Sequence, residues 1–217
     1  MSIQKNLTSI RESIPQEITL VAVSKTKPVS DLLEAYDAGQ RDFGENKIQE
    51  MTQKWEELPR DIQWHMIGHV QRNKVKYMAE YVALIHGVDS LKLLREIEKQ
   101  AKKHDRIISC LLQVHIAEED SKFGFDEAEL PALTQNPEFI KLENIRVTGL
   151  MGMATFTDDK VQVRREFKTL KALFETLKSK IPTMDILSMG MSGDYQIALE
   201  EGSTMLRIGS SIFGARN

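Results

Sequence analysis

The chain has 217 residues, 41% of them hydrophobic and 28% charged, a composition typical of a globular protein with a substantial core. Its 29 Lys and Arg against 32 Asp and Glu leave a net charge of −3, which argues against a surface for nucleic acid or an anionic membrane. No apolar run approaches the roughly 18 residues of a membrane span, and no secretory leader pattern opens the chain, so we expect a cytoplasmic protein.

The first predicted element is an amphipathic helix, because Ile3, Leu7, Ile10 and Ile14 recur at helical spacing. Strand and helix patterns then alternate along the chain. The predicted strands are Ile18–Ser24, Arg41–Gly44, Ile62–Ile67, Val82–His86, Ile107–Ile116, Ile145–Met151, Asp185–Ser188 and Met205–Ile208. The predicted helices between them are Ser30–Ala38, Lys47–Leu58, Arg72–Glu80, Leu91–Lys103, a region over Asp126–Lys141 broken by two prolines, Lys160–Ile181 and Asp194–Glu201.

Eight strands alternating with helices are typical of a (β/α)8 barrel. We therefore interpret residues 1–217 as a single α/β domain, a TIM barrel with an extra N-terminal helix. The chain ends too soon after Ile208 for a full eighth helix, so the N-terminal helix or the turn around Ile212–Phe213 is expected to cover that gap. The spacing in Lys160–Ile181 also fits a coiled-coil seam, but in an α/β chain it favours packing on the sheet.

Lys25 lies where the first predicted strand opens into a loop. The run Ile18–Val23 is typical of a strand buried on both faces, and Pro28 prevents its continuation. Barrel active sites form at this end of the strands, and a partly desolvated lysine there has a more accessible neutral amine that can attack an aldehyde. From this stretch alone, a solvated loop lysine beside Lys27 is the alternative.

Two late segments form small, donor-rich turns. Ser192 and Gly193 lie in the SMGMSGD segment after the seventh predicted strand, and Gly209 and Ser210 follow the eighth. Loops at these places form the recurrent phosphate site of this barrel, and a helix N-terminus favours an anion. Each segment alone is more typical of an ordinary turn, but together they predict a phosphate site.

A reactive lysine and a phosphate site on one barrel edge describe a ligand that carries both an aldehyde and a phosphate. Pyridoxal 5′-phosphate (PLP) is such a molecule. No metal is expected, because His65 and His69 are four residues apart but straddle a strand end, where that spacing does not converge. We expect His65 at the barrel mouth and His86 in a structural or surface role.

Six ordered motifs carry a family resemblance. The chain resembles the pyridoxal-phosphate homeostasis protein family, single-domain barrels related to the N-terminal domain of alanine racemase, from about residue 20 to residue 216. The motifs are AVSKTKP, FGEN at Phe43–Asn46, WHMIGHVQRNK at Trp64–Lys74, GLM at Gly149–Met151, SMGMSGD and RIGSSIFGAR.

The resemblance implies roles for individual residues. Lys25 would hold the cofactor as an internal aldimine, and Arg207 would face its pyridine nitrogen. The loops containing Ser192, Gly193, Gly209 and Ser210 would hold the phosphate, and Asn46 would line the cofactor's other edge. The chain departs from the family pattern at four positions, none of them among these residues: Lys47, Val70, His115 and Ala154.

The expected function is to buffer or carry PLP in vitamin B6 homeostasis without catalytic turnover, as a monomer, with PLP-dependent client enzymes as expected partners. Guanidinium has no acceptor, so a pyridine nitrogen facing Arg207 stays unprotonated and is a poorer electron sink. Two alternatives remain open: an amino-acid racemase-like PLP enzyme and a phosphosugar aldolase that uses Lys25. The racemase alternative lacks a second base for proton transfer on both faces of a substrate.

Overall fold

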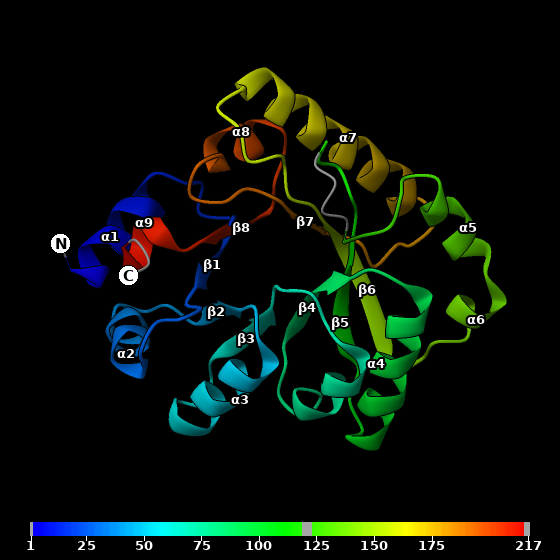
Figure 1. Ribbon diagram of the computed structural model, residues 1–217, viewed down its shortest axis with the longest axis horizontal. Helices are drawn as coiled ribbons and strands as arrows, with labels where there is room; N and C mark the ends of the chain where they lie inside the picture. Colours follow the sequence, from blue (N-terminus) through cyan, green and yellow to red (C-terminus); the bar gives the residue numbers. More distant parts are fainter. Residues whose placement is uncertain (1, 119–122, 215–217) are drawn as a thin grey trace.

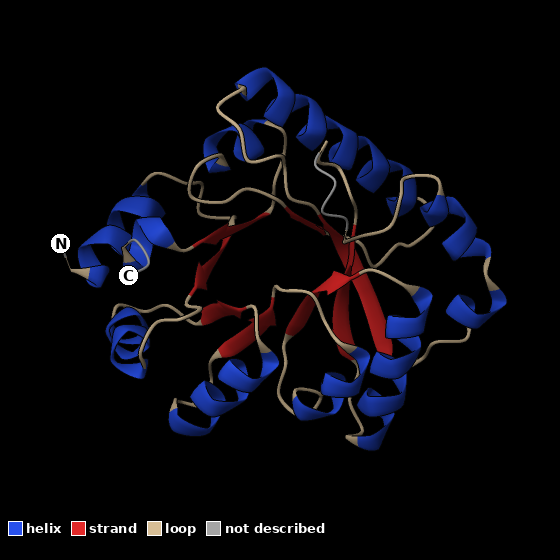
Figure 2. Ribbon diagram, in the orientation of Figure 1, coloured by secondary structure: helices blue, strands red, loops and turns tan. Residues whose placement is uncertain are grey.

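The strands close into a parallel barrel. The computed structural model describes residues 2–118 and 123–214, and its strands follow one another in chain order around a closed ring (Figures 1 and 2). β8 pairs with β1 and completes the ring. The strands are β1 (Thr19–Val23), β2 (Asp42–Glu45), β3 (Gln63–Met66), β4 (Leu84–Val88), β5 (Ile108–Gln113), β6 (Ile145–Met151), β7 (Ile186–Ser188) and β8 (Met205–Ile208).

Helices surround this ring (Figure 2). They are α1 (Ile3–Glu12), α2 (Val29–Asp37), α3 (Ile48–Glu57), the 3-10 helix η1 (Arg72–Tyr77), α4 (Leu91–Lys103), α5 (Glu129–Gln135), α6 (Pro137–Ile140), α7 (Lys160–Lys178), α8 (Tyr195–Glu200) and α9 (Ser210–Phe213). The predicted fold, a (β/α)8 barrel preceded by an N-terminal helix, is confirmed. Ala215 and Arg216, at the end of the last quoted motif, lie outside the described residues.

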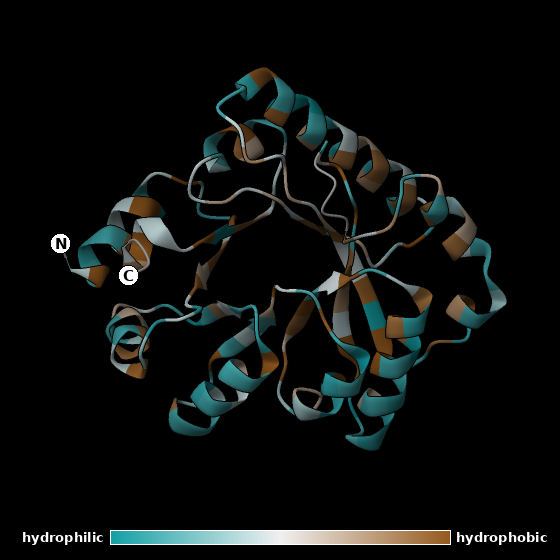
Figure 3. Cartoon of the chain, in the orientation of Figure 1, coloured by the Kyte–Doolittle hydropathy of each residue, from teal (hydrophilic) through white to brown (hydrophobic). Residues whose placement is uncertain are grey.

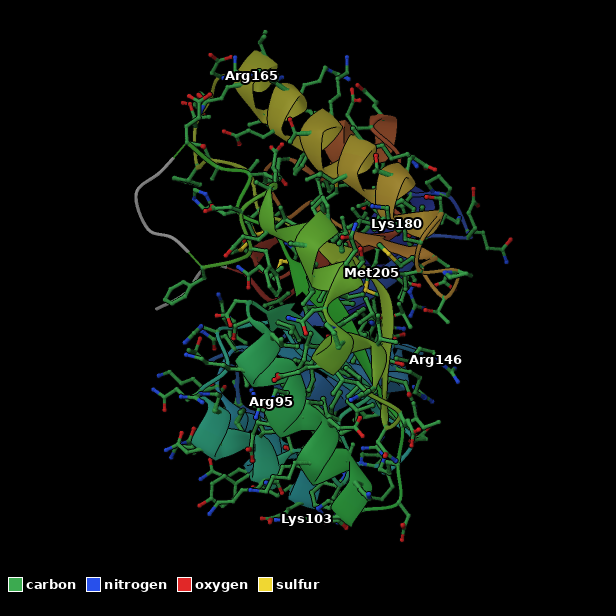
Figure 4. The ribbon with its side chains drawn as sticks, turned by 90° about the vertical axis from the view of Figure 1, so that its right-hand side faces the viewer. Arg95, Lys103, Arg146, Arg165, Lys180 and Met205 are labelled. Atoms are coloured by element: carbon green, nitrogen blue, oxygen red, sulfur yellow. The ribbon has the colours of Figure 1, made fainter. Side chains whose placement is uncertain are left out.

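Apolar side chains line both faces of the barrel wall, because alternate residues of a barrel strand point inward and outward. The inner set comes from five different strands and packs together: Val21, Leu84, Leu111, Met151 and Met205. A larger cluster joins the outer side of the wall to the helices, which carry hydrophobic and hydrophilic residues together (Figure 3). In Figure 4, Met205 lies in the middle of the molecule among the side chains, whereas Arg165 on α7 and Lys103 at the end of α4 lie at its upper and lower ends.

The gap left by the missing eighth helix is filled by two short helices. α1 packs against α9, and the two lie side by side next to β1 and β8 (Figure 1). Leu7 and Ile10 of α1 are buried, and the Asn6 Nδ2 donates to the Ile212 carbonyl at 2.9 Å. Both parts of the prediction for this gap are therefore confirmed.

The segment between β3 and β4 differs from its prediction. The expected helix over Arg72–Glu80 is instead the shorter 3-10 helix η1, and β4 begins at Leu84 rather than Val82. Arg106 holds the segment between η1 and β4, because its guanidinium donates to the carbonyls of Ala79 at 2.7 Å and Val82 at 2.8 Å. This segment is therefore tied to residue 106, which lies just before β5 in the chain.

Two further boundaries are corrected. β5 ends at Gln113, short of the predicted Ile116, because the chain turns there and Val114 forms an isolated bridge with Phe125. α7 ends at Lys178 rather than Ile181, and its apolar face packs on the barrel as predicted. Among the described residues, no helix combines the length and the apolar character that crossing a membrane requires.

Candidate cofactor-binding site

A cavity of about 750 Å³ opens at the carboxyl ends of the strands. It is lined by side chains and loops at the carboxyl ends of β1, β2, β3, β5, β6, β7 and β8, which are far apart in sequence but share one end of the ring. Every residue predicted for the site lies on its wall: Lys25, Asn46, Ser192, Gly193, Arg207, Gly209 and Ser210.

Lys25 is presented by a tight turn immediately after β1, where it is partly buried. The next residue, Thr26, has a φ of 65°, a left-handed conformation that costs free energy for a β-branched residue. The Thr26 amide donates to Glu50 Oε1 at 2.6 Å, and the Lys54 ammonium donates to the Ser24 carbonyl at 2.9 Å. α3 therefore holds both sides of this turn, which we call the lysine turn (residues 24–27).

A buried ion cluster lies beneath the lysine turn. Lys54 Nζ is 2.7 Å from Glu45 Oε1 and 2.7 Å from Glu50 Oε1, and the Ser24 hydroxyl donates to Glu45 at 2.7 Å. The Glu45 side chain is fully buried, and its burial raises the carboxyl pKa above the usual range even though Lys54 opposes the shift. The lysine turn therefore packs on a buried cluster of charged side chains. Removing one of these side chains would leave its partner as an uncompensated buried charge.

The loops after β7 and β8 contact each other at the edge of the cavity. The Ser192 hydroxyl accepts a hydrogen bond from the Gly209 amide at 3.4 Å, and Asp194 Oδ1 accepts one from the Met191 amide at 2.6 Å. A Cβ at Gly209 would lie 3.2 Å from the Val23 carbonyl, so glycine lets this loop pass close to β1. The hydroxyl groups therefore gather on the same edge as the lysine turn.

Arg207 is a buried cation in this wall, 3% exposed. Its Nη1 donates to the Ser188 hydroxyl at 2.6 Å, and its Nη2 donates to the Gly152 carbonyl at 3.0 Å. Burial lowers the pKa of the guanidinium to about 10, with Asp194 opposing the shift. Arg207 is therefore still protonated at neutral pH.

Asn46 supplies an uncommitted acceptor. Its Oδ1 is buried and has no hydrogen-bond partner within the described part of the chain, although the residue lines the cavity. A buried polar atom without a partner costs free energy, so this oxygen is placed to receive a donor from a bound molecule or from water.

The sequence patterns missed part of the site. His69 and Gln113 also line the cavity, and His69 Nδ1 pairs with Asp89 Oδ2 at 3.1 Å. The expectation that His65 lies at the barrel mouth is wrong: it is buried and hydrogen-bonded to His86 at 2.9 Å. His86 is fully buried, consistent with a structural role. Period-two alternation along β3 and β4 was the one available signal that these rings point inward.

Residues 2–118 and 123–214 contain no group of three or more His, Cys, Asp or Glu side chains placed to hold a metal ion. The polar groups of the cavity are instead two amines, one guanidinium, an imidazole, two amides, two carboxyl groups and several hydroxyls: Lys25, Lys27, Arg207, His69, Asn46, Gln113, Asp158 and Asp194, with serines and threonines. Such a set suits an organic anion that also carries a group reactive toward amines.

Fold and site together define a class of protein: (β/α)8 barrels with a lysine after the first strand and hydroxyl-rich loops after the last two. The family model described as alanine racemase, N-terminal domain, matches residues 1–217. The alanine racemase of Clostridium difficile 630 has the same fold, with a TM-score of 0.78 at 14% identity, over 99% of this chain and 57% of the racemase.

Closer relatives narrow this class. The chain is 39% identical to the pyridoxal phosphate homeostasis protein of Vibrio alginolyticus, over 100% of this chain and 98% of that protein. PipY of Synechococcus elongatus PCC7942 has been solved without PLP (TM-score 0.93, 35% identity) and with PLP bound (TM-score 0.86, 34% identity). Both PipY structures match over 98% of this chain and 100% of their own. The chain therefore belongs to the pyridoxal phosphate homeostasis protein family.

Proposed function

We propose that this protein binds pyridoxal 5′-phosphate in the cavity and serves vitamin B6 homeostasis as a buffer or carrier, without catalytic turnover. The observation that carries the proposal is the joint placement of Lys25 and the Ser192–Gly193 and Gly209–Ser210 loops on one cavity wall. A relative with 34% identity over 98% of this chain has been solved with PLP bound, which supports the same ligand here.

The residues present fit this cofactor. When bound, PLP supplies an aldehyde that reacts with amines and a ring that can delocalise negative charge. Lys25 is the amine proposed to form the covalent link, and the hydroxyls of Ser192 and Ser210 are proposed to bind the phosphate. Asn46 Oδ1, which lacks a partner in the described residues, is proposed to accept a hydrogen bond from the cofactor.

Arg207 favours holding the cofactor over using it as an electron sink. Its guanidinium is donor-only, so a ring nitrogen placed against it stays unprotonated and stabilises a carbanion poorly. Ser188 and Gly152 already fix two arms of the guanidinium, so the side chain is preorganised. We propose that loaded protein releases PLP to client enzymes, for which the open cavity mouth provides the exit.

The experiment is spectroscopic. Purified protein loaded with PLP is expected to show an imine absorption band, and borohydride reduction is expected to attach the cofactor at Lys25, as located by peptide mass spectrometry. Lys25→Ala removes the reactive amine, so the band and the label are expected to be lost. Lys27→Ala is the matched control, because Lys27 lines the same cavity but donates to the Phe213 carbonyl at 2.9 Å.

The same loaded preparation tests the absence of turnover. Incubation with L-amino acids in deuterated water is expected to exchange α-protons no faster than free PLP does. A label on Lys27, or an unchanged band in Lys25→Ala, would contradict the binding assignment. Exchange well above that of free PLP would instead favour the racemase-like alternative.

A further inference from the structure

A chain of hydrogen bonds crosses the inside of the barrel. It starts at Asp42, the first residue of β2, and ends at Arg207 on the cavity wall. Asp42 Oδ1 is 3.1 Å from His65 Nε2, His65 Nδ1 is 2.9 Å from His86 Nε2, and His86 Nδ1 is 3.1 Å from Ser188 Oγ. Ser188 Oγ accepts from Arg207 Nη1 at 2.6 Å. We call these five residues the barrel relay.

The relay is enclosed everywhere except at one end. His65, His86, Ser188 and Arg207 are at most 3% exposed, and the Asp42 side chain is 34% exposed. The apolar inner set packs within the same barrel interior. In such surroundings each ring nitrogen depends on its relay neighbour, because an unpaired buried polar atom is costly.

With both rings neutral, the Asp42 end fixes the direction of every hydrogen bond in the relay, and the Arg207 end is compatible with that direction. Arginine has no acceptor, so Ser188 Oγ must accept from it, and a carboxylate has no hydrogen, so His65 must donate to Asp42 through Nε2–H. His65 Nδ1 then accepts from His86 Nε2–H, and His86 Nδ1 accepts from the Ser188 hydroxyl. One arrangement satisfies all five residues, with both rings neutral and carrying their hydrogen on Nε2.

The opposite direction fails at Asp42. A His86 ring with its hydrogen on Nδ1 would accept at Nε2 from His65, and His65 Nε2 would then place a bare lone pair against the carboxylate unless the ring gained a proton. Burial, with a smaller contribution from the charge on Arg207, lowers the pKa of His86 well below its usual value, which agrees with a neutral ring there.

We propose that Asp42, His65 and His86 are positioning residues for Arg207, and that the carboxylate at the amino-terminal end of β2 sets how firmly the guanidinium is held toward the cofactor. When each relay residue donates its hydrogen toward Asp42, the Ser188 hydroxyl donates to His86 Nδ1 and a lone pair of Ser188 Oγ accepts from Arg207. The effect on cofactor affinity rests on the proposed function, whereas the direction of the relay does not.

The direction is tested first, on cofactor-free protein. Nitrogen-15 NMR of labelled histidine distinguishes a ring nitrogen that carries hydrogen from a bare one. The signals of His65 and His86, assigned with His65→Gln and His86→Gln, are expected to show Nε2–H and bare Nδ1 in both rings at neutral pH. A hydrogen on His86 Nδ1 would overturn the proposal, whatever the protein binds.

The second test removes the carboxylate at the Asp42 end of the relay. Asp42→Asn gives His65 Nε2 an amide donor, so the relay can reverse and place a hydrogen on His86 Nδ1. The expected result is that shift in the NMR spectrum and a PLP dissociation constant raised about tenfold, the scale of one hydrogen bond to a charged group. Asp37→Asn is the matched control, because it removes the same charge from an exposed position on α2.

Ser188→Ala keeps the test decisive if the Asp42 variant folds poorly, since it cuts the link to Arg207 and leaves Asp42 in place. Its PLP affinity is expected to fall by a similar factor. Equal affinity in wild type, Asp42→Asn and Ser188→Ala would overturn the positioning role. Failure of wild-type protein to bind PLP would count against the proposed function and leave the NMR result standing.

Discussion

Single buried groups in this barrel depend on contacts from several strands. His86 shows this at the residue scale: it lies on β4, but its ring bonds to residues of β3 and β7. Burial keeps the ring neutral by lowering its pKa well below the usual value, whereas in the unfolded chain it titrates near pH 6.5. As pH falls below about 6.5, the unfolded chain takes up a proton that folded His86 does not, so folding loses stability.

This gives the first residue-scale prediction. The free energy of unfolding, measured by urea titration, is expected to fall between pH 7 and pH 5. In His86→Gln the slope is expected to be smaller by up to about 1.4 kcal/mol per pH unit, the value for one proton. His104→Gln, on the exposed end of α4, serves as control and should keep the wild-type slope. Equal slopes in His86→Gln and wild type would contradict the explanation.

At the scale of elements, α3 shapes the site although it lies outside the barrel. One turn of this helix places Glu50 and Lys54 under the lysine turn, where they bond to Thr26 and Ser24. The left-handed Thr26 persists because these contacts hold it. The conformation that presents Lys25 is therefore built by a helix more than twenty residues further along the chain.

Removing one partner of this cluster tests that role. Lys54→Ala leaves the fully buried Glu45 without its cation, and is expected to cost about 3–5 kcal/mol of unfolding free energy and to weaken PLP binding. Lys171→Ala is the matched control, since Lys171 forms an i,i+4 pair with Glu175 on the exposed face of α7 and its loss should change stability little. Similar losses of unfolding free energy in Lys54→Ala and Lys171→Ala would show that the buried cluster does not support the lysine turn.

At the scale of the whole molecule, closure of the ring depends on residues from both ends of the described chain. α1 takes the place of an eighth helix by packing on α9, which directly follows Gly209 at the cavity. Leu7 of α1 is 1% exposed and belongs to the main apolar cluster. The N-terminal helix therefore supports the β8 edge that carries the predicted phosphate loop.

Shortening the Leu7 side chain is expected to lower both the stability of the protein and its affinity for PLP. Leu7→Ala is expected to lower the unfolding free energy by about 2–5 kcal/mol, the range for a buried leucine, and to raise the PLP dissociation constant through loosening of α9. Leu33→Ala, at a 39% exposed position of α2, should cost less than about 1 kcal/mol. Urea titration and imine absorbance measure the two effects; a Leu7→Ala loss no larger than that of Leu33→Ala would contradict the role of α1.

The sequence by itself determined the order and type of nearly all the elements, because strand and helix periodicities are local and β6, β8 and α4 have the predicted bounds. It also predicted that Lys25 and the two late loops would lie on one edge, since the carboxyl ends of parallel strands meet at one edge of a barrel. The seven predicted site residues share one cavity for this reason.

Only the tertiary structure decided which side chains meet inside the ring. His65 and His86 are 21 residues apart and Ser188 lies 102 residues beyond His86, so no local pattern predicts their hydrogen bonds. The same holds for Arg106, which holds the segment after η1 through carbonyls 24 and 27 residues away. Such contacts depend on strand register and barrel closure, and these are set by packing among residues that are distant in sequence.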